Sequence, residues 1–149
     1  MKKIEFNSIL VPLEGSPKSY EAVDYALEIA KHFKNCSITL CYVIEENVLK
    51  PLAAYQSEDI NVLFEQYEEQ GKIYFNNAVK RADKKGFDST SIMIKILRGD
   101  PGEEIVNFSA NFDLIVLTVR AKLHSPENSI GKVSRYVLSM SKTPVFVVT

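Results

Sequence analysis

The sequence predicts an α/β protein built on an open parallel sheet that carries helices on both of its faces. Short apolar runs alternate with amphipathic helical segments along the whole chain, which is typical of strands that are buried on both sides. A length of 149 residues suits one domain with a single hydrophobic core. No repeat, low-complexity tract or linker divides the chain, so residues 1–149 are expected to form one domain.

The first half of the pattern begins with a strand at Ile9 to Leu13. Ser16 is expected to cap the following helix, because Pro17 then occupies its first position. The apolar face of that helix consists of Val23, Ala26, Leu27, Ala30 and Phe33. A second strand is expected over Ser37 to Val43.

Cys36 and Cys41 flank and occupy this second strand. Their odd spacing places the two side chains on opposite faces of the strand, which argues against a disulfide. Two thiols without a nearby histidine also make a poor metal site. We expect both cysteines to be reduced and partly buried.

Residues 45 to 59 show no clear periodicity and contain Pro51, which leaves a functional flap and a disordered connection as open alternatives. A long helix is expected from Ile60 to Lys85, where Gly86 ends it. The apolar stripe of that helix is Leu63, Tyr67, Tyr74, Ala78 and Ala82.

The second half of the chain repeats the alternation. A third strand, Ser91 to Leu97, leads to a short helix that Asp100 caps, with Pro101 at its first position and Glu103 able to complete a capping box. Ile105, Phe108 and Phe112 form the buried side of that helix. The remaining elements are a fourth strand at Leu114 to Leu117, a helix at Val133 to Met140 and a last strand at Val145 to Val148.

In sheets of this kind, ligands bind beyond the carboxyl ends of the strands, where the strand order reverses. Four segments, ILVPLEGS, LRGDPGEEI, DLIVL with IGKVSRYVL, and TPVFVV, resemble the universal stress protein family in the right order over essentially the whole chain. The resemblance implies the adenine-nucleotide α-hydrolase-like fold, a five-stranded parallel sheet in the order 3-2-1-4-5. Strands one and four are then neighbours at the switch point.

The resemblance also implies where ATP would bind. The first loop of the family reads V-P-V-D-G-S, so Glu14 stands where the family's aspartate contacts the nucleotide, and Val43 matches the residue near the adenine. The candidate nucleotide-binding residues are Pro12, Leu13, Glu14, Val43, Leu117, Thr118, Ala121, Gly131, Lys132, Val133 and Ser134. In each case a plain structural role is the alternative: a solvated loop acid for Glu14, the end of a buried strand for Thr118 and an exposed lysine for Lys132.

In the family's phosphate loop, two residues separate the first glycine from the second, and nine residues separate the second from the third. A serine or threonine follows the third glycine directly. Thr118, Ala121, Gly131 and Lys132 occupy those positions, so three of the four differ. Thr118 adds a β-branched side chain where the backbone should approach the ligand. Lys132 removes a hydroxyl but adds a cation at a helix start, and Ser134 matches a hydroxyl that the family often has two residues later. The sequence favours weakened or lost ATP binding, with a nucleotide site that uses a modified phosphate loop as the alternative.

No catalytic constellation stands out, so no catalytic residue is assigned. Gly131 and Lys132 resemble the end of a P-loop, but Pro126 and Val133 occupy the positions that the motif needs. His124 and Ser125 lack an acid to orient them. A phosphoacceptor receiver domain is a further alternative, although the chain offers no lysine after its last strand.

Composition and the last strand define the expected partners. The net charge of −1, the absence of a long apolar run and the polar first residues favour a cytoplasmic protein that binds neither nucleic acid nor a membrane. The last strand, Val145–Thr149, is apolar and uncharged at a sheet edge, which invites pairing with a second copy. We expect a homodimeric stress-response or regulatory module, because the family commonly dimerises through this strand.

Overall fold

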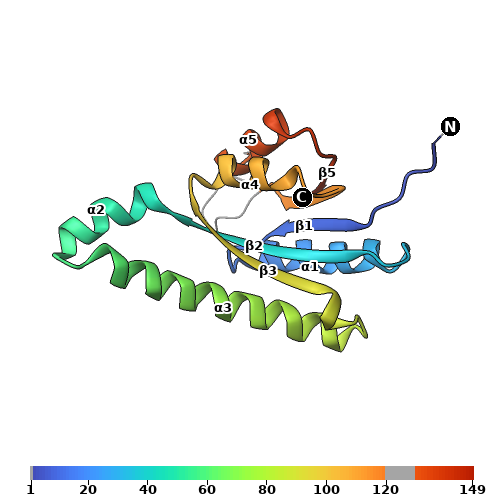
Figure 1. Cartoon of the computed structure of the whole chain (residues 1–149), viewed down its shortest axis with the longest axis horizontal. Helices are drawn as coiled ribbons and strands as arrows, with labels where there is room; N and C mark the ends of the chain where they lie inside the picture. The colour runs from blue at the N-terminus through green and yellow to red at the C-terminus, as the bar shows by residue number, and fades with distance from the viewer. Residues whose placement is uncertain (1, 120–129) are drawn as a thin grey trace.

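The computed structural model describes residues 2–119 and 130–149, which form one five-stranded parallel sheet with helices on both faces (Figure 1). Its strands are β1 (Ser8–Pro12), β2 (Ser37–Glu45), β3 (Ile92–Gly99), β4 (Leu114–Thr118) and β5 (Val145–Val148). The order is β3-β2-β1-β4-β5 and all pairings are parallel, which confirms the predicted topology. The strand order reverses between β1 and β4, which are neighbours in the sheet. The carboxyl ends of these two strands therefore lie on either side of the switch point.

The helices are α1 (Pro17–Ala30), α2 (Glu46–Gln56), α3 (Ile60–Lys84), α4 (Pro101–Ser109) and α5 (Lys132–Met140), and a 3-10 turn covers Ser89–Ser91. Helices α1 and α3 cover one face of the sheet, and α4 and α5 cover the other (Figure 1). The sheet therefore separates two hydrophobic clusters rather than one. Ile9 and Val11 of β1 point into the larger cluster, whereas Leu10 points into the smaller one.

Both predicted helix caps are confirmed. Ser16 Oγ accepts a hydrogen bond of 3.1 Å from the Ser19 N–H, and the Asp100 carboxylate accepts one of 3.1 Å from the Glu103 N–H. A proline follows each cap at the start of its helix. These local signals fix where α1 and α4 begin, and thus how the loops at the carboxyl ends of β1 and β3 are shaped.

Most of the segment 45–59, expected as a flap or a disordered connection, is helix α2 (Glu46–Gln56). α2 contains Pro51 at an exposed position, while Leu49 and Ala53 are buried. Those two apolar residues, four apart, pack on one side of the helix. Ser57 ends α2 in a left-handed conformation with φ of 53°, and the Asp59 side chain caps α3.

The cysteines lie on opposite faces of the sheet, as expected. Cys36 is 7% exposed in the cluster under α1 and α3, and Cys41 is 1% exposed in the cluster under α4 and α5. Both are free thiols.

The stripe predicted for α3 is confirmed. Leu63, Ala78 and Ala82 are buried, and Tyr67 and Tyr74 are half-buried and pack against the same hydrophobic cluster. The other buried positions of α3 are Phe64, Gly71 and Phe75.

Candidate functional site

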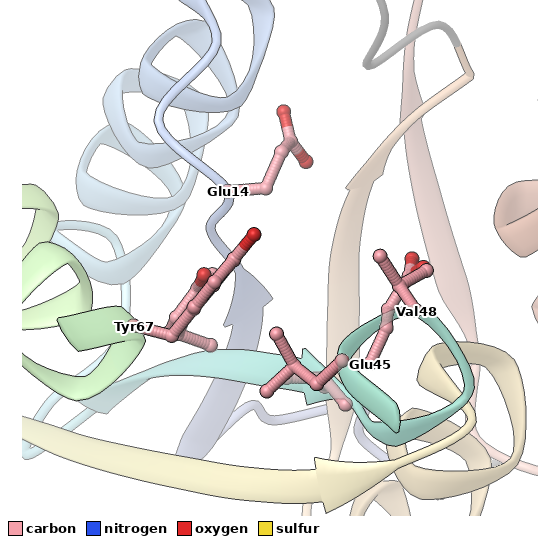
Figure 2. Close-up of a pocket in the computed structure, with 7 residues that line it drawn as sticks. Glu14, Glu45, Val48 and Tyr67 are labelled. Carbon is pink, nitrogen blue, oxygen red and sulfur yellow. The ribbon is translucent and has the colours of Figure 1, made fainter. Parts of the chain in front are cut away.

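A pocket of about 210 Å³ lies at the carboxyl ends of β1 and β2 (Figure 2). The loop after β1 supplies one wall, the end of β2 the floor, and helices α2 and α3 the remaining sides. Its lining residues are Glu14, Tyr42, Val43, Glu45, Val48, Leu49 and Tyr67. The pocket thus forms where a ligand site is expected in an open parallel sheet.

Glu14 stands at the rim of this pocket, at the start of the turn that leads to α1. Its side chain is exposed, and its Oε1 accepts a hydrogen bond from the Ser16 hydroxyl. Partial burial by the surrounding loop raises the pKa of Glu14, and hydrogen bonds with Ser16 and Ser19 oppose that rise. The carboxylate is therefore positioned by the helix cap and less well solvated than a free surface glutamate.

Tyrosines form the inner wall. Tyr42 is 8% exposed, and its ring meets that of Tyr74 edge-on, with 5.6 Å between ring centroids and 84° between ring planes. Burial raises the pKa of Tyr42 to about 12, and the neighbouring Tyr74, Tyr67 and Glu45 add to this rise. The Tyr42 hydroxyl consequently keeps its proton over the physiological pH range.

The connection from β4 to α5 forms a second region. Thr118 is 5% exposed, and its carbonyl accepts a hydrogen bond from the hydroxyl of Ser134, which is 4% exposed. The Gly131 N–H donates to the Val119 carbonyl at 2.8 Å, and Gly131 has an ordinary φ of −60°. Lys132 is exposed at the first position of α5. The buried hydroxyl and the backbone bond tie the start of α5 to the end of β4.

The structure brings only part of the predicted site together. Glu14 and Val43 line the same pocket. Leu13 and Leu117 are buried on opposite faces of the sheet, and Pro12 and Val133 are half-buried. Ala121, like Arg120, Lys122, His124, Ser125 and Pro126, lies outside the described residues.

Five lining residues were missed: Tyr42, Glu45, Val48, Leu49 and Tyr67. Tyr42 and Glu45 could have been found, because they flank Val43 at the end of β2. Val48 and Leu49 could not, because they belong to the helix that the sequence pattern did not predict. Tyr67 was predicted only as part of the apolar stripe of α3; it packs against the core cluster and also lines the pocket.

Residues 2–119 and 130–149 contain no group of three or more histidine, cysteine, aspartate or glutamate residues that could hold a metal ion. None of the helices in this part of the chain has both the length and the apolar character needed to cross a membrane. The observed strand order also differs from the order 2-1-3-4-5 of receiver-type sheets, which removes the receiver alternative.

The sheet order, the helices on both faces and the pocket at the strand ends define the class, a doubly wound α/β protein with the adenine-nucleotide α-hydrolase-like fold. The model of the universal stress protein family matches residues 5–149. Universal stress protein MJ0531 of Methanocaldococcus jannaschii is 30% identical, over 96% of this chain and 82% of that protein. The chain therefore belongs to the universal stress protein family.

Solved structures agree with this assignment. The structure of MJ0577, a protein of the same organism, has a TM-score of 0.81 at 26% identity and covers 97% of this chain and 96% of its own. Universal stress protein UspA from Lactobacillus plantarum has a TM-score of 0.81 at 19% identity, over 99% of this chain and all of that one. The second likeness supports the fold alone.

Proposed function

We propose that the protein is a dimeric stress-response or regulatory module of the cytoplasm, in which ATP binding in the family's standard pose is weakened or lost. The observation that carries this proposal is the pairing of Thr118 with Ser134. A buried threonine stands at the first glycine position of the phosphate loop, and the Ser134 hydroxyl donates to its carbonyl. The hydroxyl that could meet a phosphate is therefore engaged within the fold.

The charge of the pocket supports the same proposal. Glu14 and Glu45 both line it, and among residues 2–119 and 130–149 no lysine, arginine or histidine does so. A polyanionic ligand that approached this pocket would meet two carboxylates and no compensating cation from these described walls.

Nucleotide content is the direct test. The purified protein should release no nucleotide when it is denatured and chromatographed, and ATP with magnesium should leave its melting temperature unchanged. Bound nucleotide, or a clear rise in melting temperature, would contradict the proposal.

A restored loop sharpens this test. The triple variant Thr118→Gly, Ala121→Gly, Lys132→Ser rebuilds the family pattern and should bind ATP more tightly than the unaltered chain. Lys142→Ser is the matched control, because it removes another exposed lysine outside the loop. Circular dichroism checks that the triple variant keeps its fold.

A nucleotide site with a modified phosphate loop is the second candidate, and Lys132 favours it. Its ammonium group stands at the first position of α5, where the partial positive charge of the helix disfavours a cation. A bound phosphate would relieve that repulsion. If ATP does bind, Lys132→Gln should weaken its binding about tenfold, as expected for one charge-assisted contact.

Dimerisation is proposed to occur through β5. The Ile115 N–H donates to the Pro144 carbonyl and the Val119 N–H to the Val148 carbonyl, so even-numbered residues of β5 face β4. The backbone groups of Val145 and Val147 consequently point to the free edge of the sheet. Phe146 is 39% exposed beside that edge. A two-fold axis at this edge would pair the two strands antiparallel.

A proline at the free edge tests the dimer. Val147→Pro removes an outward N–H without removing a hydrogen bond to β4, so it should shift the protein from dimer to monomer in light scattering. Val147→Thr is the control, because it keeps both the N–H and the strand propensity. A monomeric unaltered chain at micromolar concentration would refute the proposal.

A further inference from the structure

The outward side of α3 carries charges of both signs around one exposed apolar side chain. α3 runs along one margin of the molecule (Figure 1), and its 25 residues are about 37 Å long. Each residue turns the helix by about 100°, so one stripe of residues lies opposite the side that packs on the sheet. We call this the outward stripe, and its members are the exposed residues Val62, Glu65, Glu69, Ile73, Lys80 and Lys84.

The charges of α3 are divided between its two halves. Residues 60–71 contain three glutamates and no lysine or arginine, whereas residues 72–84 contain four basic residues and one aspartate. The helix dipole does not account for the glutamates, because it acts within the first turn and the first turn of α3 has no acidic residue. A helix with opposite charges in its two halves is complementary to an antiparallel copy of itself.

Most charges of the outward stripe are not used within the chain. Among the residues that the structure describes, Glu65, Lys80 and Lys84 have no ion-pair partner. Glu69 and Lys72 form a pair of 2.9 Å, but both side chains are more than half exposed, so this pair contributes little. The charges of the outward stripe are therefore available to a partner.

Ile73 lies where the two halves of α3 meet, and it is 52% exposed. A two-fold axis beside Ile73 would place two antiparallel helices against each other, with equal distances on either side of the axis. Glu69 and Glu65 precede Ile73 by about 6 and 12 Å along the helix, and Lys80 follows it by about 10 Å. The partner's Lys80 would thus lie between Glu65 and Glu69, and the partner's Lys84 just beyond Glu65.

We propose that the outward stripe of α3 binds a second copy of this chain, antiparallel and with the two-fold axis beside Ile73. The opposed charges set the register of the two helices, and the two Ile73 side chains exclude water at the centre. α3 covers β2 and β3, whereas β5 lies at the opposite edge of the sheet. This contact is therefore separate from the proposed pairing through β5, and the two contacts together would join dimers into larger assemblies.

An exchange of charges tests the proposal. All chains carry Val147→Pro, which is expected to remove the contact through β5, and this single variant is the parent. Glu65→Lys with Glu69→Lys makes the outward stripe uniformly basic, and Lys80→Glu with Lys84→Glu makes it uniformly acidic. In sedimentation equilibrium at low salt the parent should self-associate, and each pair of substitutions should weaken that association about tenfold or more.

The mixture of the two charge variants gives the decisive result. A one-to-one mixture should associate again, because a basic stripe then faces an acidic one, and added salt should weaken this association. Ile73→Gln should also weaken self-association of the parent, because it removes the apolar contact at the axis without changing the charge. The readout is the difference between the parent and the α3 variants, so it is the same whether or not β5 forms a contact.

Glu5→Lys with Glu28→Lys is the matched control. It changes the net charge by the same amount as the basic variant, at two exposed glutamates outside α3, and should leave self-association unchanged. Circular dichroism checks that each variant keeps its helix content. The proposal would be overturned if the parent does not associate at millimolar concentration, if the mixture does not associate, or if the control weakens association as much as the α3 variants do.

Discussion

The turn that carries Glu14 should be sensitive to a single methyl group at Gly15. Gly15 has φ of +86°, a conformation that side chains disfavour, and a Cβ there would collide with Cε1 of Tyr74. Gly15→Ala therefore imposes two separate penalties, backbone strain and a collision with an aromatic ring. Two other glycines of the chain allow these penalties to be separated.

Gly86→Ala isolates the backbone penalty, because Gly86 has φ of +73° and nothing within 4 Å of the added Cβ. It should cost about 1–2 kcal/mol of unfolding free energy. Gly71→Ala isolates the collision, because its Cβ would lie 2.6 Å from Cδ1 of Tyr42 within the regular helix α3. Overpacking costs about 1–3 kcal/mol, and alanine returns up to about 1 kcal/mol of helix propensity. Gly15→Ala combines both penalties and should cost about 2–5 kcal/mol.

Equilibrium urea unfolding, followed by circular dichroism, measures these differences. A double-mutant cycle with Tyr74→Ala gives the decisive number. In the Tyr74→Ala background the ring is absent, so Gly15→Ala should cost only the backbone term, and the coupling free energy should be about 1–3 kcal/mol. If Gly15→Ala costs no more than Gly86→Ala, or the cycle shows no coupling, the contact with Tyr74 does not constrain the turn.

Two further predictions follow from raised pKa values. Because the folded-state pKa of Glu14 lies above its ordinary value of 4.5, the folded protein holds this proton more tightly, and stability is lost as pH rises from that value through the folded-state pKa. Glu14→Gln should lack this loss, so the urea midpoints of the unaltered chain and of the variant should diverge over that pH range. Midpoints that change with pH in parallel would show that the pKa of Glu14 is not raised by folding. Burial raises the pKa of Cys41 to about 12, so at pH 8 only about one thiol in ten thousand is ionised. Cys41 should react with a thiol reagent only on unfolding, and rapid labelling of the native Cys36→Ser variant would contradict this.

Helix caps and apolar runs predicted most of the helices and strands, because the interactions that form these elements involve residues close together in the sequence. A serine or aspartate followed by proline begins α1 and α4, since the side chain satisfies a backbone N–H within three residues. Apolar runs marked all five strands. In β1, β2 and β4 the cause is burial on both faces of the sheet, whereas the edge strands β3 and β5 are apolar although they are partly exposed. The strand order came from the family resemblance, because pairing between distant strands leaves no local mark.

Helix α2 was missed because its stability comes from elsewhere. Only Leu49 and Ala53 are buried, and Pro51 removes a backbone donor from the helix interior. An eleven-residue segment of this composition shows little periodicity by itself, and it is helical where it packs on the rest of the fold. The pocket was missed with it, because α2 supplies one of its walls.

The tyrosine contacts link this missed wall to the part of the site that the sequence did indicate. Tyr74 of α3 presses on Gly15 next to Glu14, and Tyr42 of β2 presses on Gly71 of α3. The two rings also contact each other. Side chains from β2 and α3 thereby fix the turn that holds Glu14. By contrast, Thr118, which the family resemblance aligns with the first glycine of the phosphate loop, packs as a buried residue at the end of β4. Close packing against a tyrosine ring thus requires glycine at Gly15 and Gly71 beside the pocket, and also at Gly102, where the ring of Tyr136 leaves no room for a Cβ.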